Sequence, residues 1–447
     1  MSRPGVIRPV RYGWFFVSRN LPPPAASSAK HVTLERTLLV IGVLSLGYNL
    51  RGAITSLPPV FPELQDSLGL SNATISILAA TPVICFGVVS GFAAGLARRA
   101  GEERVLLGAI IGLTIGLVAR GAAPSAMLFP GTIVASAAIA VMNVLLSSLI
   151  KRRWPERAGF LIGLYITALS AGAIVGSLVS VPLWNGTGGS VVLTLGWVAA
   201  PAALAALLWL PQLKESARTG AGTVPAGASA VPAAPGPPPH LARVPVHRHA
   251  ITWYVTIFMG MQSLLYYATL SWLPTMLRDR GESAAGAGDL LALMGVGNLA
   301  VSLFVPMLAQ RLHSQVTLVV PTVLAIVGGL AALLYAPLSG APAWALILGA
   351  GQNAALALAI FFTAARAPHA AAAASLSSLS QAVGYLLASA GPLEVGLLHS
   401  ATGSWTAPVA VLFAFSVVMF VAGILAARPK MLPEAAEPAA PQPKENA

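Results

Sequence analysis

An arginine lies deep inside the first apolar segment of the sequence. Residues 38–57 read LLVIGVLSLGYNLRGAITSL, and Tyr48, Asn49 and Arg51 lie in the second half of that run. At about 1.5 Å per helical residue, Arg51 lies about 20 Å from the start of the segment, past the middle of a hydrocarbon core about 30 Å thick. An arginine at that depth costs about 3 kcal/mol or more and usually faces a bundle interior or a water-filled cavity.

Two structural roles compete with a binding role for Arg51. Its side chain can extend to the outer membrane interface, or backbone carbonyls can neutralise it so that it only packs. No carboxylate accompanies it within residues 38–57, and Tyr48 and Asn49 offer polar groups beside it. The pattern therefore favours a substrate-binding arginine, with Tyr48 and Asn49 in the same site.

Pairs of amide and phenol side chains recur in two later apolar segments. Gln262 and Tyr266 are four residues apart, as are Gln381 and Tyr385, so each pair shares one face of a helix. These groups can orient a small substrate that Arg51 holds by charge, or they can form hydrogen bonds between helices. Weaker candidates for the same site are Tyr165, Asn143, Asn298 and Asn353.

The composition is that of a membrane protein. Of the 447 residues, 56% are hydrophobic and only 9% are charged, and the mean hydropathy is +0.78. So little charge cannot cover the surface of a soluble globular protein. Long stretches contain almost no charged residue, which is typical of transmembrane helices.

The pattern predicts an all-α membrane protein with twelve transmembrane helices in two six-helix bundles. The predicted spans are 38–57, 74–97, 104–121, 125–150, 158–183, 191–210, 251–275, 284–309, 316–336, 343–365, 371–397 and 406–427. The expected divisions are a cytoplasmic tail at 1–37, a first bundle at 38–212, a linker at 213–250, a second bundle at 251–427 and a tail at 428–447. The linker is rich in Ala, Pro and Gly, a composition with no core of its own.

The basic residues lie almost entirely on one predicted side of the membrane. Of the 26 Lys and Arg residues, only Arg120, Arg278 and Arg280 fall in predicted outer loops, and Arg51 falls inside a span. Because positive loops favour the cytoplasm, the sequence predicts an even number of spans with both termini in the cytoplasm. This topology, rather than nucleic-acid binding, explains the net charge of +12.

The two halves repeat each other at a nearly constant offset. Residues 69–96 match residues 281–308, and Ser71 and Ser283 are natural N-caps for the helices that follow. Two six-span halves in the same orientation imply a pseudo-two-fold axis along the membrane normal, with a site between the halves.

The repeat also adds candidates to the site. It places Tyr267 at the position equivalent to Arg51. Trp272 lies near the outer end of the seventh span, where it is either an aromatic anchor at the membrane interface or part of a cavity wall or gate.

The architecture resembles the major facilitator superfamily over residues 38–428. The loop between the second and third spans is similar to that superfamily's basic motif, G-x-L-A-D-R-x-G-R-R. The matching residues are Leu96, Ala97, Arg99 and Gly101. Arg98 stands where the superfamily has an acid, and Glu102 and Glu103 stand where it has a basic pair. Within the superfamily, NLRGAITSLPP, LSSLIKRRWPERAG, MGMQSLLYYATLSWLP and SQAVGYLLASAGPL look like the cyanate and 2-nitroimidazole transporter family.

The resemblance implies secondary transport of a small polar or anionic solute by alternating access. A cyanate-like anion is the first expectation, and export of a neutral nitroaromatic compound such as 2-nitroimidazole is the alternative, because Arg51 can also donate hydrogen bonds to a nitro group. The repeat and the resemblance together assign a gating role to Arg99, Arg153, Arg311 and Arg366.

A membrane-embedded enzyme or sensor without transport activity is the competing class. An enzyme needs a nucleophile with a base, or clustered carboxylates and histidines, at membrane depth, and a sensor needs a further soluble domain. The sequence has none of these patterns, so we expect no enzyme activity, no cofactor and no metal. The expected protein is a monomer in a bacterial inner membrane, whose partners are a small-molecule substrate and lipids, without nucleic acid.

Overall fold

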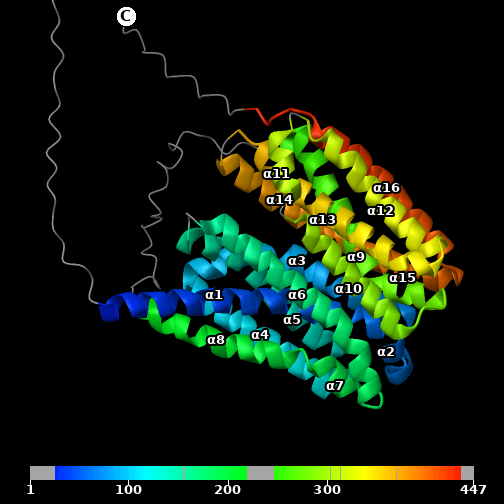
Figure 1. The fold of residues 1–447 in the computed structure, drawn as a ribbon, viewed down its shortest axis with the longest axis horizontal. Coiled ribbons are helices and arrows are strands. Elements are labelled where there is room, and N and C mark those ends of the chain that lie inside the picture. The colour runs from blue at the N-terminus through cyan, green and yellow to red at the C-terminus, as the bar shows by residue number, and fades with distance from the viewer. Residues whose placement is uncertain are drawn as a thin grey trace, which may run out of the picture.

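The computed structural model describes residues 26–154, 157–218, 246–302, 304–312, 314–368 and 370–433. Over these residues the chain is helical almost throughout (Figure 1). Most of the predicted linker, residues 219–245, lies outside the described residues, as do residues 1–25 and 434–447 of the predicted tails.

The first half of the chain forms six long helical units. They are α1 (Ala26–Thr55), α3 (Asn72–Ala100), α4 (Glu102–Ala122), α5 (Pro124–Arg153), α6 (Ala158–Gly186) and the pair α7 (Val191–Gly196) and α8 (Ala199–Arg218). Two short elements, η1 (Pro58–Val60) and α2 (Phe61–Leu68), connect α1 to α3. Helix α1 begins well before residue 38, the predicted start of the first span.

The second half repeats this plan. Its units are α9 (Ala250–Asp279), α10 (Ala284–Val301) with α11 (Phe304–Arg311), α12 (Val316–Tyr335), α13 (Ala341–Ala365), α14 (Ala370–Ala388) with α15 (Ala390–Thr402), and α16 (Thr406–Ala427). The short elements η3 (Val246–Arg248) and η4 (Leu338–Gly340) precede α9 and α13. The predicted all-α fold of two six-helix bundles is confirmed.

Local sequence signals explain several helix ends. The hydroxyl oxygens of Ser71 and Ser283 accept hydrogen bonds from the backbone N–H groups of Thr74 at 3.1 Å and Gly286 at 2.9 Å. Both predicted N-caps are therefore confirmed. Helix α2 ends at Leu68 and is capped by Gly69, whose φ of 63° lies in the left-handed region that glycine adopts without strain.

The two halves lie side by side, with the first half toward the lower left of Figure 1 and the second toward the upper right. We call the end of the bundle where α8 stops and α9 starts the linker end, and the opposite end, which carries α2, the α2 end. The halves pack against each other through α6 with α10, α3 with α14 and α15, and η1 with α9 and α10.

Among the described residues, ten helical stretches are long and apolar enough to cross a membrane by their length and composition. The other two predicted spans correspond to α9 and to the α14–α15 pair. Helix α9 has 30 residues, about 45 Å at 1.5 Å per residue, and its neighbours bury most residues from Thr252 to Leu277. A helix that contacts so little lipid can carry polar side chains such as Gln262.

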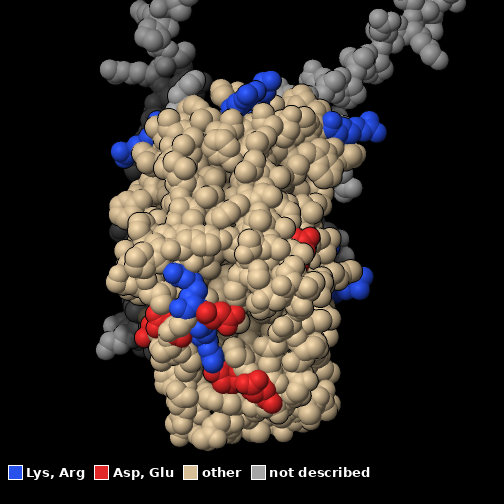
Figure 2. All heavy atoms as spheres, turned by 90° about the vertical axis from the view of Figure 1, so that its right-hand side faces the viewer, with Lys and Arg blue, Asp and Glu red and all other residues tan. Residues whose placement is uncertain are grey.

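The surface is consistent with a lipid environment. Seen from the right-hand side of Figure 1, broad areas carry neither acidic nor basic side chains, and the charged residues gather in a few small groups (Figure 2). Large apolar side chains such as Phe92, Phe160 and Leu324 are exposed on the described helices. In water such surfaces would be unfavourable, whereas in a bilayer they contact lipid tails.

Small residues allow α1 and α6 to approach closely. A Cβ atom at Gly172 would overlap the backbone carbonyl of Tyr48, and one at Gly176 would meet Thr55. The hydroxyl of Thr55 donates a hydrogen bond to the carbonyl of Ala173 at 3.0 Å, which joins the same two helices. This contact fixes the half of α1 that carries Arg51.

Candidate functional site

A cavity that opens to solvent, with about 350 Å³ of space including part of that solvent, lies between the two halves. Its walls come from α1 in the first half and from α9, α10, α13 and α14 in the second. The lining residues are Arg51, Gln262, Ser263, Tyr266, Tyr267, Asn298, Gln352, Asn353, Leu356 and Tyr385. Apart from Leu356 these residues are polar, and Arg51 carries the charge among them.

Arg51 connects the two halves at this cavity. Its Nη1 donates a hydrogen bond to the hydroxyl of Tyr266 on α9, and its guanidinium carbon lies 4.8 Å from the centre of the Tyr266 ring. The other N–H donors of the guanidinium have no acceptor among the described residues, and no carboxylate lines the described cavity. The arrangement leaves a positive charge with free donors, which suits an anion or another hydrogen-bond acceptor.

Four amide side chains from the second half complete the polar lining, namely Gln262, Asn298, Gln352 and Asn353. Gln262, which is 3% exposed, donates through Nε2 to the carbonyl of Met259 at 3.1 Å and to the hydroxyl of Ser263 at 2.6 Å. Gln352 on α13 is 2% exposed, and neither its Nε2 nor its Oε1 has a partner among the described residues. The Oδ1 of Asn298 on α10 is likewise buried without a partner there.

The wall of the cavity includes three tyrosine rings, those of Tyr266, Tyr267 and Tyr385. The rings of Tyr266 and Tyr267 meet edge to face with their centres 5.1 Å apart. Phe86 of α3 reaches across from the first half and contacts Tyr267 and Tyr385 edge to face, at 6.2 Å and 5.8 Å between ring centres. Such a wall offers a flat or edge contact to a planar molecule.

Five predicted site residues thus come together at the cavity, namely Arg51, Gln262, Tyr266, Tyr267 and Tyr385. The two neighbours of Arg51 do not join them. The side-chain amide of Asn49 donates to the carbonyls of Ser45 at 2.8 Å and Pro201 at 3.2 Å, which ties α1 to α8. Tyr48 is partly buried and is absent from the lining.

Four more predicted residues lie elsewhere. The hydroxyl of Tyr165 donates to Oδ1 of Asn143 at 3.2 Å, joining α6 to α5 within the first half. Gln381 is exposed and donates to the hydroxyl of Ser377 at 3.0 Å. Trp272 is 1% exposed and donates through Nε1 to the carbonyl of Pro392 at 2.8 Å. Its burial excludes the role of a lipid-facing anchor, and the role of a cavity wall or gate stays a prediction.

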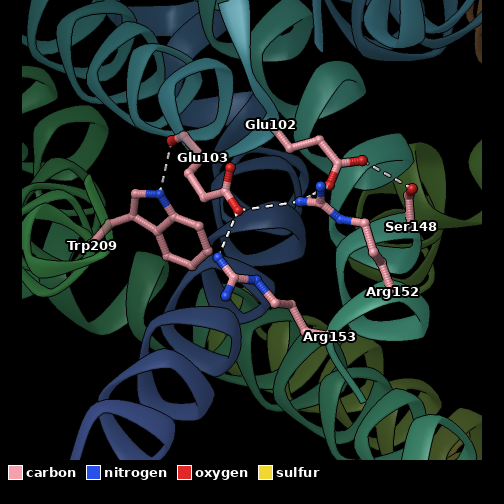
Figure 3. Close-up of polar contacts among 6 residues, drawn as sticks. All are labelled: Glu102, Glu103, Ser148, Arg152, Arg153 and Trp209. Carbon is pink, nitrogen blue, oxygen red and sulfur yellow. Dashed lines mark hydrogen bonds and ion pairs between the residues drawn. The ribbon is translucent and has the colours of Figure 1, made fainter. Parts of the chain in front are cut away.

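The predicted gating residue Arg153 belongs to an ionic cluster at the linker end of the first half (Figure 3). Oε1 of Glu103 accepts from Nη2 of Arg153 at 2.9 Å and of Arg152 at 3.2 Å, and Arg152 also pairs with Glu102 at 2.7 Å. The indole of Trp209 donates to the carbonyl of Glu103 at 3.0 Å. The carboxylates of Glu102 and Glu103 thus join α4 to α5, and the backbone carbonyl of Glu103 joins α4 to α8.

Arg366 holds the equivalent position in the second half and is 6% exposed. Its Nε donates to the carbonyl of Ala426 at 2.8 Å, and its Nη2 donates to that of Ala427 at 3.0 Å and to Oε1 of Gln315. These bonds cap the end of α16 and attach it to α12 and α13. Arg153 and Arg366 therefore join helices within their own halves. The other two predicted gating residues, Arg99 and Arg311, are exposed near the linker end.

Contacts at the α2 end close the halves against each other. Nη1 of Arg278 donates to Oε1 of Glu63 at 2.7 Å, and the rings of Phe61 and Trp272 lie 6.3 Å apart between centres. A Cβ atom at Gly288 of α10 would lie 3.1 Å from the carbonyl of Ser177 on α6. The cavity is therefore closed off on this side.

Sequence reasoning missed Gln352, Ser263 and Leu356 as lining residues. A signal was present for Gln352, because Gln352 and Asn353 form an adjacent polar pair inside an apolar span. Asn298 and Asn353, the weaker candidates, both line the cavity. Among the described residues, no group of three or more His, Cys, Asp or Glu side chains is placed to hold a metal ion.

Comparison with known proteins gives a consistent result. The family model of the Major Facilitator Superfamily matches residues 37–392. An uncharacterized transporter of Bacillus subtilis, YycB, is 37% identical over 398 residues, which are 88% of this chain and 94% of that protein. The 2-nitroimidazole transporter of Escherichia coli is 33% identical over 89% of this chain and 97% of its own length. The cyanate transport protein CynX of Escherichia coli is 27% identical over 82% and 91%.

The fold is also similar to solved structures. A bacterial homologue of the human lysosomal transporter Spinster superposes with a TM-score of 0.69 over 88% of this chain and 97% of that one, at 17% sequence identity. At that identity, the similarity concerns the fold.

Proposed function

Because the chain belongs to the Major Facilitator Superfamily, we propose that it is a secondary active transporter that moves a small polar or anionic solute across the membrane by alternating access. Membrane transport itself follows from the family and from relatives that cover most of the chain. The substrate and the mechanism are the proposed parts.

The charge of the central cavity carries the proposal. Arg51 supplies a positive charge and free N–H donors, and no carboxylate among the described lining residues neutralises it. An anion bound there would form charge-assisted hydrogen bonds, which are about twice as strong as neutral ones. A cyanate-like anion fits this requirement, and one relative is named for cyanate transport.

The contacts between the halves support alternating access. The cavity lies at their boundary, and Glu63 and Arg278 close the α2 end. Each half is fastened internally at the linker end, by Arg153 with Glu103 and by Arg366 with Gln315. Two internally fastened halves that meet at a central site can rock as rigid bodies and expose the site to each side in turn.

The distribution of basic residues supports an orientation. Arg152, Arg153, Arg311 and Arg366 all lie at the linker end, which we assign to the cytoplasm by the positive-inside rule. The α2 end then faces the outside, and both termini lie in the cytoplasm. The bacterial relatives favour the inner membrane, with lipids as the surrounding partners.

Export of a neutral nitroaromatic compound is the second candidate. The relative named for 2-nitroimidazole is more similar to this chain than the one named for cyanate. The aromatic wall formed by Tyr266, Tyr267 and Tyr385 suits a planar ring, and Arg51 can donate to nitro oxygens.

A binding experiment tests the proposal. A thermal-shift screen of the purified protein against cyanate, acetate, benzoate and 2-nitroimidazole identifies ligands, and equilibrium binding then compares variants. Arg51→Ala should lose about 1.5–3 kcal/mol of charge-assisted bonding, roughly a ten- to hundredfold lower affinity. Arg428→Ala, which removes an exposed arginine just after α16 that does not line the cavity, is the matched control. A folded Arg51→Ala protein with wild-type affinity would remove Arg51 from the site.

A further inference from the structure

Gln352 is a buried amide that lacks hydrogen-bond partners. It lines the central cavity, is 2% exposed, and has no partner for Nε2 or Oε1 among the described residues. A buried polar group without a partner destabilises the folded state, and native proteins rarely keep one without a functional reason. The central cavity beside Gln352 offers such a reason, because a ligand bound there would supply the missing hydrogen-bond partners.

The packing of α13 directs Gln352 to the cavity. A Cβ atom at Gly349 would overlap the backbone of Met294 on α10, and one at Gly351 would lie 3.0 Å from Ile326 on α12. Two faces of α13 are therefore in close contact with neighbouring helices. Gln352 lies between these two contacts, about 60° around the helix from Gly349 and about 100° from Gly351. It lines the cavity together with Leu356, four residues later.

Arg51 and Gln352 approach the cavity from different halves and differ in chemistry. Arg51 on α1 offers charge and donors only, whereas the amide of Gln352 on α13 offers two donors and an acceptor. An amide without partners matches a ligand group that both donates and accepts, such as a carboxamide. The tyrosine rings that line the cavity also offer a contact surface to a planar ring.

We infer that Gln352 is a specificity-determining residue that hydrogen-bonds the end of the substrate remote from Arg51. The substrate class is then a planar ring compound with an anionic or accepting group at one end and a group that both donates and accepts hydrogen bonds at the other. This inference rests on the proposed function, because it takes Arg51 as the anchor of the first end.

Matched ligands test the second end separately from the first. Benzoate carries only the anionic group, 3- and 4-carbamoylbenzoate add a carboxamide at two spacings, and 3- and 4-acetylbenzoate replace its NH₂ by a methyl group of similar size. Wild-type protein should bind at least one carbamoylbenzoate about tenfold more tightly than benzoate and than the corresponding acetylbenzoate.

Gln352→Leu removes the amide while keeping a similar volume. Its affinity for the preferred carbamoylbenzoate should fall about tenfold, while its affinity for benzoate stays within about twofold. Its melting temperature without ligand should be equal to or above that of wild type, because an unpaired amide has been removed. Gln352→Met provides an unbranched variant if the leucine does not fold. Gln212→Leu on α8, which also removes a buried glutamine with an unpaired Oε1, should change neither affinity.

The outcomes separate the inference from the proposed function. Equal losses for benzoate and carbamoylbenzoate in Gln352→Leu, or unchanged discrimination between them, would overturn the role of Gln352, even if Arg51→Ala abolishes binding of both. Binding of cyanate but of no benzoate by wild-type protein would overturn the ring class and leave the anion site intact. If neither cyanate nor any of the benzoates binds to the wild-type protein, the proposed function and this inference fail together.

Discussion

The guanidinium of Arg278, at the end of α9, donates a hydrogen bond to the carboxylate of Glu63 on α2 with Nη1 and Oε1 2.7 Å apart. The two residues belong to different halves of the protein. Their side chains are 25% and 14% exposed, so water only partly screens the pair. This ion pair therefore stabilises the state in which the α2 end is closed.

Removing the Arg278 side chain should open the α2 end more often. Loss of a partly buried ion pair between the halves amounts to about 1 kcal/mol, or about a fivefold shift in population. A cysteine introduced at the cavity position Asn353, with the native Cys85 replaced by serine, reports the opening. Arg278→Ala should raise its labelling by a membrane-impermeant maleimide added outside intact cells by about fivefold.

Arg280→Ala is the matched control, since Arg280 donates to the carbonyls of Leu333 and Ala336 within the second half only. A double variant, Glu63→Arg with Arg278→Glu, exchanges the two charges and keeps the ion pair. In this variant, labelling of the cysteine at position 353 should return toward the wild-type level. Unchanged labelling in Arg278→Ala would show that the ion pair does not hold the α2 end closed.

The close contact of α1 with α6 should not tolerate a larger residue. A Cβ atom at Gly172 would overlap the carbonyl oxygen of Tyr48, so Gly172→Ala must separate the two helices. Overpacking of this kind costs about 1–3 kcal/mol. We expect a lower melting temperature in detergent and weaker ligand binding, because α1 carries Arg51. Gly108→Ala on α4, where a Cβ would meet nothing within 4 Å, should leave both properties unchanged.

The fold follows largely from the sequence because its signals are local and repeated. Long apolar segments, the N-caps Ser71 and Ser283 and the internal repeat each correspond to features of the structure. The start of α1 at Ala26 was not predicted, because residues 26–37 are too polar for the hydropathy pattern that marks a span. A helix outside the hydrocarbon core needs no apolar run.

The site was only partly predictable, because a helix gives each polar side chain a direction that spacing alone does not fix. Arg51, Gln262 and Tyr266 face the cavity as predicted, while Asn49, two residues before Arg51, points toward α8 instead. Adjacent residues on a helix differ in direction by about 100°, so membership of the same segment does not imply membership of the same site. Which of the polar side chains on a helix points into the site depends on how the neighbouring helices pack against that helix.

Arg366 should be important for the stability of the second half. Its guanidinium bonds two carbonyls at the end of α16 and the side chain of Gln315, all within a buried site. Arg366→Ala leaves these acceptors without a donor, which costs about 2–3 kcal/mol. We expect a melting temperature several degrees lower for the purified protein, and Arg366→Lys should recover little of it because an ammonium lacks the planar fork. The exposed Arg311→Ala should have almost no effect, and an equally stable Arg366→Ala protein would contradict the capping role.

The geometry of Arg51 should matter as well as its charge. Nη1 is occupied by the hydroxyl of Tyr266, and the rest of the planar guanidinium remains available to a ligand. A lysine keeps the charge but cannot bond Tyr266 and an anion along two parallel directions, so Arg51→Lys should bind about tenfold more weakly than wild type while exceeding Arg51→Ala. Tyr266→Phe removes a neutral hydrogen-bond partner of the guanidinium and should weaken binding less, by about 0.5–1.5 kcal/mol. The order of these affinities is measured by equilibrium binding of the best anion from the screen. A melting curve for each variant controls for folding. If Arg51→Lys binds as tightly as wild type, the positive charge alone holds the anion and the fork has no role.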